Sequence, residues 1–330
     1  MRFLVLGGAG YVGSHTALAL IENGHEVVVA DNLVTGYRQA VPEKAKFYLG
    51  DVRDRDFMDW VFNKEKIDAV IHSIHASRED DSTERPLSYY DNDFYGTKVT
   101  LDTMVDHGVQ SIVFSSSSSS IYGDHEGLLI CEEDQQRPTN RYGEMKLNME
   151  RLIAWAANAY GLKFVFLRYF NVCGSHESGA IGEYHDSASH LIPLVLQVPN
   201  GKRESVSIYG TDYDTPDGTC IRDYIHVTDL AEAHILAVEY LAKGGESNIF
   251  NLGNGVGYSV REVIETARRV TGHPIPATEV PRRAGDPARL VASGEKAKNI
   301  LGWEPKIKQL DEIVESAWKW HRKHPDGYTN

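Results

Sequence analysis

The chain has 330 residues, of which 42% are hydrophobic and 25% are charged, and its 34 Lys and Arg against 47 Asp and Glu give a net charge of −13. This composition is typical of a folded globular protein with room for about two domains, and it excludes a disordered or fibrous chain. The acidic balance disfavours nucleic acid and anionic membranes as partners. An anionic ligand would need a local cationic cradle.

The cysteines and the apolar runs narrow the class of protein further. Three cysteines without C-x-x-C spacing indicate neither a disulfide framework nor a zinc site. No apolar stretch approaches the roughly 18 residues that cross a bilayer, and the run after Met1 is broken at Gly7, too early for a secretory signal. We therefore expect a cytoplasmic protein with no membrane partner. The cysteines are Cys131, Cys173 and Cys220.

The first half of the chain alternates short strand patterns with longer helical patterns. This order is typical of repeated βαβ units and predicts an α/β fold, a Rossmann-type doubly wound parallel sheet with helices on both faces. Gly24 and Gly161 stand where helix C-caps are expected. The predicted strands are Phe3–Leu6, Glu26–Ala30, Lys46–Leu49, Ala69–His72, Ser111–Ser115 and Phe164–Arg168, and the predicted helices are Ser14–Asn23, Tyr90–His107 and Arg141–Tyr160.

The second half is rich in loops after residue 175 and then resumes regular patterns. Strands over Tyr224–Val227 and Asn248–Leu252, around a helix over Asp229–Lys243, predict that the chain returns to the sheet. Another helix begins at Ser259, where Glu262 completes a capping box. The last third therefore indicates a smaller α/β domain interleaved with the first. The expected domains are 1–175 with the return segment 222–254, and 176–221 with 255–330.

A glycine-rich turn directly follows the first predicted strand. Residues 7–13 read G-G-A-G-Y-V-G and open a helix, as expected where a diphosphate approaches backbone N–H groups at a helix N-terminus. Asp31 ends the second strand, 21 residues after the middle glycine, where its carboxylate can accept hydrogen bonds from an adenosine ribose. This predicts NAD rather than NADP. Asp51 and Val52 can border the adenine, although a helix N-cap is an equal interpretation of Asp51.

Tyr142 and Lys146 lie at i and i+4 on a predicted helix and therefore share one face. A phenol with a pKa of about 10 is a poor base, but a nearby ammonium and a cationic nicotinamide ring favour the phenolate. The serine run 115–120 ends the preceding strand and can present a hydroxyl beside the tyrosine. Together with the dinucleotide turn, these residues predict hydride transfer.

Taken together, these motifs resemble the extended short-chain dehydrogenase/reductase family, and within it the nucleotide-sugar 4-epimerases, over essentially the whole chain. The resemblance implies tightly held NAD, no metal, a UDP-hexose substrate bound by the smaller domain, and a homodimer. It rests on residues 7–13, 31–32, 89–92, 117–123, 142–146, 168–171, 222–227, 251–253, 282–286 and 301–303.

The resemblance also assigns roles to individual residues. Tyr142 resembles the catalytic base, Lys146 the residue that holds the nicotinamide ribose and lowers the tyrosine pKa, and Ser118 the catalytic hydroxyl. Arg222 and Arg283 resemble a pair that faces the diphosphate, which the planar guanidinium suits. The implied cofactor residues are Gly7, Gly10, Tyr11, Val12, Gly13, Asp31, Asn32, Asp51, Val52, Asn92, Tyr142, Lys146 and Tyr169. The implied substrate residues are Ser118, Tyr142, Asn171, His190, Tyr209, Arg222, Arg283, Asp286 and Leu290.

The reaction implied by this resemblance is reversible 4-epimerisation of UDP-galactose and UDP-glucose through a 4-keto sugar, with hydride held transiently by NAD. Two alternatives stay open: a UDP-N-acetylhexosamine 4-epimerase, and a catalytically silent NAD-sensing member. An elimination reaction is disfavoured because Ile121, not a carboxylate, follows the serines. Leu290 is intermediate in size at the position that controls entry of an acetamido group in relatives, and core packing is an equal interpretation of it.

Two departures from the family pattern affect the site. The serine run holds one residue more than the family pattern between Phe114 and Tyr122. If the pattern is aligned at Tyr122, the catalytic hydroxyl belongs to Ser118, and if it is aligned at Phe114, the hydroxyl belongs to Ser117. We favour Ser118.

In the segment 73–82 the family pattern is also changed. Ser77 replaces a usual Lys, with Arg78 beside it, and His75 replaces a usual Gly. Either His75 crowds the nicotinamide or it turns outward. Asp93 replaces the more usual Asn beside Asn92.

Overall fold

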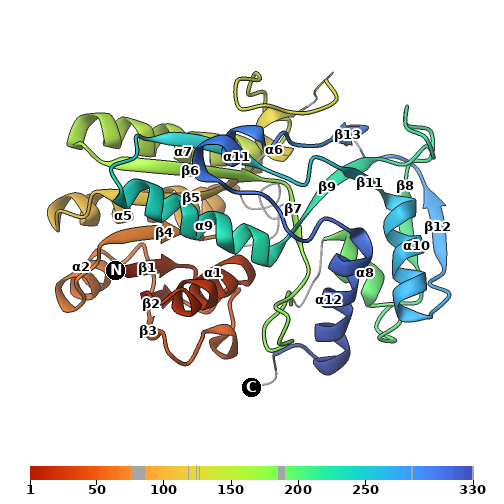
Figure 1. Cartoon of the computed structure of the whole chain (residues 1–330), viewed down its shortest axis with the longest axis horizontal. Coiled ribbons are helices and arrows are strands. Elements are labelled where there is room, and N and C mark those ends of the chain that lie inside the picture. The colour runs from red at the N-terminus through yellow and green to blue at the C-terminus, as the bar shows by residue number, and fades with distance from the viewer. Residues whose placement is uncertain are drawn as a thin grey trace.

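The computed structural model describes residues 1–75, 86–117, 119–123, 125, 127–184, 190–283 and 285–328. A parallel seven-stranded sheet runs through the first part of the molecule (Figure 1). The order reverses between β1 and β4, and such switch points form the ligand crevice of doubly wound sheets. The strands, in spatial order, are β10 (Asn248–Leu252), β6 (Lys163–Tyr169), β5 (Ser111–Ser117), β4 (Ala69–His72), β1 (Arg2–Leu6), β2 (Glu26–Asp31) and β3 (Lys46–Leu49).

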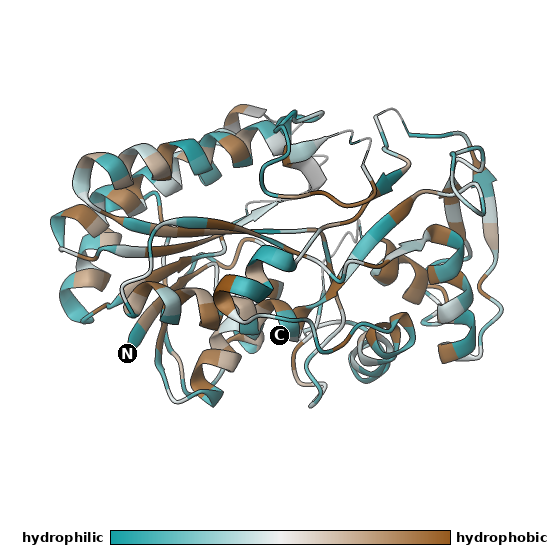
Figure 2. Ribbon diagram, turned by 45° about the horizontal axis from the view of Figure 1, so that its top comes forward, coloured by the Kyte–Doolittle hydropathy of each residue, from teal (hydrophilic) through white to brown (hydrophobic). Residues whose placement is uncertain are grey.

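Helices cover both faces of this sheet, so its strands are apolar on both sides. Along β1, Phe3 and Val5 contribute to one core and Leu4 and Leu6 to the other, because successive side chains point to opposite faces. Figure 2 shows brown, hydrophobic strands between helices that carry teal on their outer sides. The first face is covered by α1 (Tyr11–Glu22) and α9 (Val227–Ala242), and the second by α2 (Arg55–Lys64), α5 (Gly96–Asp106) and α7 (Arg141–Tyr160).

Local capping signals explain where several helices begin and end. The Asn140 side chain accepts a hydrogen bond from the Gly143 N–H (2.8 Å) at the start of α7, and Gly161 ends that helix with φ of 74°. Ser259 and Glu262 form the predicted capping box of α10 (Val260–Thr271).

The structure differs in part from the single helix predicted over residues 90–107. Its first turn is a π-helix, η2 (Tyr90–Tyr95), which follows α4 (Pro86–Tyr89) and leads into α5. Single π turns inside helices occur frequently at functional sites.

The second part of the molecule has two small sheets around a separate core. The strand expected over 224–227 does not join the main sheet, because β9 (Ile221–His226) pairs with β7 (Asn171–Cys173), β11 (Gly257–Ser259) and β13 (Arg289–Leu290). The chain returns to the main sheet through α9 and β10, which pairs with β6. The remaining elements are β8 (Val206–Tyr209), β12 (Ala277–Val280), η1 (Arg38–Ala40), α6 (Ser119–Tyr122), α8 (Leu191–Leu196), α11 (Glu295–Leu301) and α12 (Leu310–Lys323).

Three further findings concern membrane spans, metal sites and disulfides. Among the described residues, no helix is long and apolar enough to cross a bilayer. In the same ranges, no group of three or more His, Cys, Asp or Glu side chains is arranged to hold a metal ion. All three cysteines are free thiols, and two of them are buried.

Candidate active site

The glycine turn after β1 is shaped for close approach of a ligand to the backbone. Gly7 has a φ of +76°, and a Cβ there would lie 2.6 Å from the carbonyl oxygen of Ser73. A Cβ on Gly13 would lie 2.2 Å from the Gly7 carbonyl oxygen, so a larger residue cannot take its place. Helix α1 begins after Gly10 without any side-chain cap. Its N-terminus is therefore a cradle of backbone N–H groups that fits a dinucleotide diphosphate.

Asp31 lies at the end of β2, beside this turn. Its carboxylate accepts hydrogen bonds from the backbone N–H of Ala9 (3.0 Å) and of Leu33 (2.8 Å). Burial raises the pKa of Asp31, and the two backbone hydrogen bonds oppose that rise. These bonds hold the carboxylate next to the glycine turn, where it suits the hydroxyls of a ribose.

The carboxylate of Asp51 binds the Arg53 side chain and does not cap a helix. The Arg53 guanidinium donates two hydrogen bonds to its carboxylate (2.9 and 2.7 Å) and lowers the pKa of Asp51 to about 2. Asn32 also donates to it (3.2 Å). The N-cap of α2 is Asp54, so the capping interpretation of Asp51 is wrong. Val52 is buried in the core, and a role for either residue at the adenine stays a prediction.

Three other predicted cofactor residues make contacts within the protein. The Tyr11 hydroxyl donates to the carbonyl of Gly174 (2.6 Å), which ties α1 to the segment after β7. Val12 packs against the first core. Asn92 lies in η2 and donates from Nδ2 to the carboxylate of Asp93 (2.9 Å). Their contacts with a cofactor stay predictions.

The first two turns of α7 bring the catalytic pair together, as the i, i+4 spacing predicts. The ammonium of Lys146 lies 5.7 Å from the ring centre of Tyr142 and 3.5 Å from the carbonyl oxygen of Ser115. Lys146 is only 3% exposed, and burial lowers its pKa, which the carboxylates of Asp93 and Glu150 oppose. A buried cation therefore stands beside the phenol.

The serines at the end of β5 have different partners. Ser115 hydrogen-bonds with Nε2 of His234 (2.8 Å), and Ser116 donates to Glu150 (2.6 Å). Ser117 is the last residue of the strand and is buried. Ser118 lies outside the described residues, so the choice between Ser117 and Ser118 stays a prediction.

His75, just beyond the end of β4, points into the site. Its ring centre lies 5.1 Å from that of Tyr142, and its Nδ1 lies 3.6 Å from the carboxylate of Asp93 and 3.2 Å from the hydroxyl of Tyr89. The outward orientation considered above is therefore wrong. Ser77 and Arg78 lie outside the described residues.

Four predicted substrate residues are gathered into two pairs in the second part of the molecule. Arg222 on β9 contacts Asp286 (3.0 Å) and donates to the carbonyl of Pro287 (2.9 Å). The guanidinium of Arg283 lies 4.0 Å from the ring centre of Tyr209. A stacked arginine beside an anchored one is an arrangement that suits a diphosphate.

The other predicted substrate residues are held separately. His190 lies 2.6 Å from the buried carboxylate of Glu183, and Asn171 opens β7. Leu290 pairs with Arg222 in the backbone register but is buried in an apolar cluster. The other members of the cluster are Tyr122, Ile130, Phe170 and Ala292. Leu290 therefore does pack in a core, and its role as a gate stays a prediction.

Tyr169 is half-buried opposite Ser117 in the pairing of β5 with β6. Burial raises its pKa to about 12, opposed by a hydrogen bond with Ser115. Its contact with a cofactor stays a prediction.

Sequence reasoning missed the support beneath the serine strand. Glu150 and Arg168 form a buried ion pair (2.5 Å), and Arg168 also donates to the hydroxyl of Tyr122 (2.7 Å). The signal was present, because Glu150 stands four residues after Lys146 on the same face of α7. A carboxylate on a buried helix face needs a cation.

Comparison with known proteins agrees with this geometry. Residues 3–253 match the model of the NAD dependent epimerase/dehydratase family. A UDP-glucose 4-epimerase of Halalkalibacterium halodurans is 54% identical over 329 residues, covering 100% of this chain and 98% of the relative.

Solved structures are similar over their whole length as well. A crystal structure of a UDP-glucose 4-epimerase superposes with a TM-score of 0.97 at 50% identity, with full coverage of both chains. The Bifidobacterium longum enzyme, solved in complex with NAD+ and UDP, has a TM-score of 0.93 at 40% identity, covering 99% of this chain and 100% of that one.

Proposed function

This chain belongs to the NAD dependent epimerase/dehydratase family, and on that premise we propose that it interconverts UDP-galactose and UDP-glucose by inverting C4 of the hexose. The observation that carries the proposal is the pair of Tyr142 and buried Lys146, across the switch point from the glycine turn. Relatives that match the chain over its whole length are UDP-glucose 4-epimerases.

The cradle of α1 and the carboxylate of Asp31 fit NAD, and they would hold its diphosphate and adenosine ribose. Bound there, NAD would supply a hydride acceptor for C4 of the hexose and a hydride donor for the 4-keto sugar. Lys146 would hold the nicotinamide ribose. The residues of this chain then have two tasks. They accept and return the proton of the sugar 4-hydroxyl, and they let the hexose rotate while the nucleotide stays bound.

Tyr142 accepts the proton of the sugar 4-hydroxyl as its phenolate and donates it back after the sugar has turned. Lys146 stabilises the phenolate because its ammonium is desolvated and nearby, where a charge acts strongly. Ser118, with Ser117 as the alternative, hydrogen-bonds the same hydroxyl and orients it for transfer.

The nucleotide has to stay bound while the hexose turns. Arg222, Arg283 and Tyr209 support a firm grip on the diphosphate, with Asp286 orienting Arg222. Asn171 and His190 complete the shell around the UDP-sugar. A firm hold on UDP and a loose hold on the sugar let the 4-keto sugar present either face.

We also infer the domain division, the assembly and the compartment. Residues 1–175 with 222–254 are assigned to NAD binding and 176–221 with 255–330 to UDP-sugar binding, except that Asn171 on β7 and Arg222 on β9, strands that pair outside the main sheet, are assigned to the UDP-sugar. A homodimer is supported by apolar side chains on the outside of α7, where Trp155 is 69% exposed and Tyr160 is 63% exposed. Free thiols support a cytoplasmic location.

The test is to incubate the purified protein with UDP-galactose, without added cofactor, and to measure UDP-glucose. Product formation establishes the reaction and the retained NAD together. UDP-N-acetylglucosamine, assayed in parallel, tests the N-acetylhexosamine alternative. A protein that carries NAD but converts neither sugar would contradict the proposal and favour the NAD-sensing alternative.

A further inference from the structure

Asp223 places a carboxylate at the centre of the small sheet that carries Arg222. Its side chain is fully buried on β9, the strand between β11 and β13. The two carboxylate oxygens accept hydrogen bonds from three backbone N–H groups, those of Asn254 (2.7 Å), Gly255 (3.2 Å) and Ala292 (3.1 Å). These donors lie 31, 32 and 69 positions further along the chain. The carboxylate therefore joins segments that are distant in the sequence.

Asp223 is charged at neutral pH although it is buried. Burial raises its pKa to about 6, and the three N–H groups and the charge of Arg289 oppose that rise. A group with this pKa is still mostly ionised at neutral pH. Hydrogen bonds to an ionised acceptor are roughly twice as strong as those between neutral groups. The carboxylate therefore holds the three segments more firmly than an amide side chain would.

The segment that contains β13 is bonded to β9 before and after its strand. β13 has only two residues, so its own pairing with β9 is short. Before the strand, Arg222 binds the carboxylate of Asp286 (3.0 Å) and the carbonyl of Pro287 (2.9 Å). After the strand, the N–H of Ala292 donates to Asp223. Arg222 and Asp223, whose side chains point to opposite faces of β9, therefore hold the two ends of this segment.

The other two hydrogen bonds of Asp223 reach the connection between β10 and β11. β10 belongs to the main sheet, and β11 pairs with β9. Gly253 begins this connection, and a Cβ there would lie 2.4 Å from Oδ2 of Asp223 and 2.7 Å from the Cβ of Ala292. Asp223 thus lies where the main sheet meets the part of the molecule that contains the predicted diphosphate residues.

Given the proposed epimerase reaction, on which this inference rests, we propose that Asp223 is a positioning residue for the grip on UDP. By binding the backbone of both neighbours of β9, it holds the segment with Asp286 in place and keeps Arg222 in position for the diphosphate. Because Asp223 acts through Arg222, its loss should weaken the binding of UDP and leave the chemical step intact.

The experiment compares the wild type with Asp223→Asn, each as the full chain with its retained cofactor. Asparagine has the same shape, but its NH2 group cannot accept a hydrogen bond, so at least one of the three N–H groups loses its partner. The dissociation constant of UDP, measured by calorimetry, and KM for UDP-galactose should both rise about 10-fold, because a hydrogen bond to a charged group is lost. The value of kcat and the amount of retained NAD should be unchanged. Asp223→Glu, which keeps the charge but displaces the oxygens, should give the same split if the asparagine variant does not fold.

The matched control is Asp229→Asn, which changes another buried carboxylate. Burial also raises the pKa of Asp229, and its carboxylate accepts from the backbone N–H of Ile307 (2.9 Å), 78 positions away. Asp229 lies on α9 and not in the small sheet. This variant should lower the unfolding midpoint, because a buried N–H group loses its acceptor, but the dissociation constant of UDP should stay the same.

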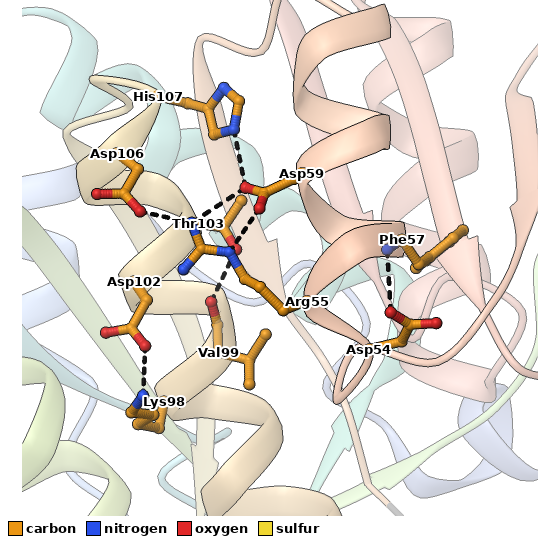
Figure 3. A network of polar contacts seen from close by, with 10 residues as sticks. All are labelled: Asp54, Arg55, Phe57, Asp59, Lys98, Val99, Asp102, Thr103, Asp106 and His107. Atoms are coloured by element: carbon orange, nitrogen blue, oxygen red, sulfur yellow. Dashed lines mark hydrogen bonds and ion pairs between the residues drawn. The ribbon is translucent and has the colours of Figure 1, made fainter.

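Two further variants separate positioning from a general effect of the substitution. Asp54 accepts from the N–H of Phe57 (3.1 Å) at the start of α2 (Figure 3), and Asp54→Asn should change neither UDP binding nor the midpoint, because asparagine caps a helix equally well. Arg222→Ala should itself raise the dissociation constant of UDP. Adding Asp223→Asn to Arg222→Ala should have little further effect, because Asp223 acts through this arginine.

Amide hydrogen exchange gives a readout that depends on neither UDP nor turnover. The N–H groups of Asn254, Gly255 and Ala292 should exchange faster in Asp223→Asn than in the wild type. In Asp229→Asn they should exchange as in the wild type.

Three results would overturn the proposal: an unchanged dissociation constant of UDP in Asp223→Asn, an equal rise in Asp229→Asn, or effects of Asp223→Asn and Arg222→Ala that simply add. Failure of the wild type to bind UDP or to convert UDP-galactose would instead contradict the proposed function. The exchange measurement would still decide whether Asp223 holds the three segments.

Discussion

Replacing Glu150 by glutamine tests the support beneath the serine strand. Glu150 and Arg168 are 3% and 1% exposed, and the glutamate accepts hydrogen bonds from Ser116 (2.6 Å) and from two nitrogens of Arg168 (2.9 and 2.5 Å). Glutamine keeps the shape but leaves the guanidinium without its counter-charge. Breaking a buried pair in this way costs about 3–5 kcal/mol. At about 2 °C per kcal/mol for a long chain, the unfolding midpoint should fall by about 6–10 °C.

The assay is thermal unfolding followed by circular dichroism, with kcat measured on the same samples. Turnover should also fall, because Ser116 directly precedes the residues that supply the catalytic hydroxyl. Glu304→Gln is the matched control, since that glutamate is 51% exposed and its pairs with Lys298 and Lys308 lie in solvent. It should leave the midpoint unchanged. A midpoint for Glu150→Gln equal to that of the control would refute the reasoning.

Four more predictions follow from the site and the core. Tyr142→Phe should lower kcat by about 100-fold or more while the protein retains NAD, as loss of a general base requires, and near-normal turnover would disprove the assignment. Ser118→Ala should lower kcat more than Ser117→Ala, and the reverse order would transfer the role to Ser117. The wild type should convert UDP-N-acetylglucosamine slowly, and Leu290→Tyr should abolish that activity but spare the conversion of UDP-glucose. If the wild type does not convert UDP-N-acetylglucosamine and Leu290→Ala does not create this activity, Leu290 does not control entry of the acetamido group. Burial lowers the pKa of His234 from 6.5 to about 4, so the unfolded chain takes up a proton that the native state does not. Stability measured by urea unfolding should therefore fall as pH drops from 6.5 to 4, by about 1.4 kcal/mol per pH unit from this group, and His234→Gln should flatten the slope; parallel curves would contradict this.

The local parts of the fold could be read from the sequence because they depend on neighbouring residues. The close approach of Gly13 to Gly7, the bounds of α7 and the capping box of α10 each follow from contacts within a few positions along the chain, whereas the close approach of Gly7 to Ser73 does not. The Rossmann-type doubly wound sheet is also confirmed. It could be predicted because alternating strands and helices leave few ways to cover both faces of a sheet. Helical spacing also determined that Tyr142 and Lys146 share a face.

Contacts between distant segments were decided only by the tertiary structure. β9 has the pattern of a core strand, but its hydrogen bonds go to β7 and β11, and no local signal selects a sheet. The sequence also left open whether Asp51 caps a helix. In the structure its carboxylate accepts a hydrogen bond from the Arg53 guanidinium instead. The position of His75 involves a buried carboxylate 18 positions away, Asp93, which lies 3.6 Å from its Nδ1. Helix and turn signals act over a few residues, whereas charge pairing and strand pairing depend on which segments meet in space, and that is determined by burial of the whole chain.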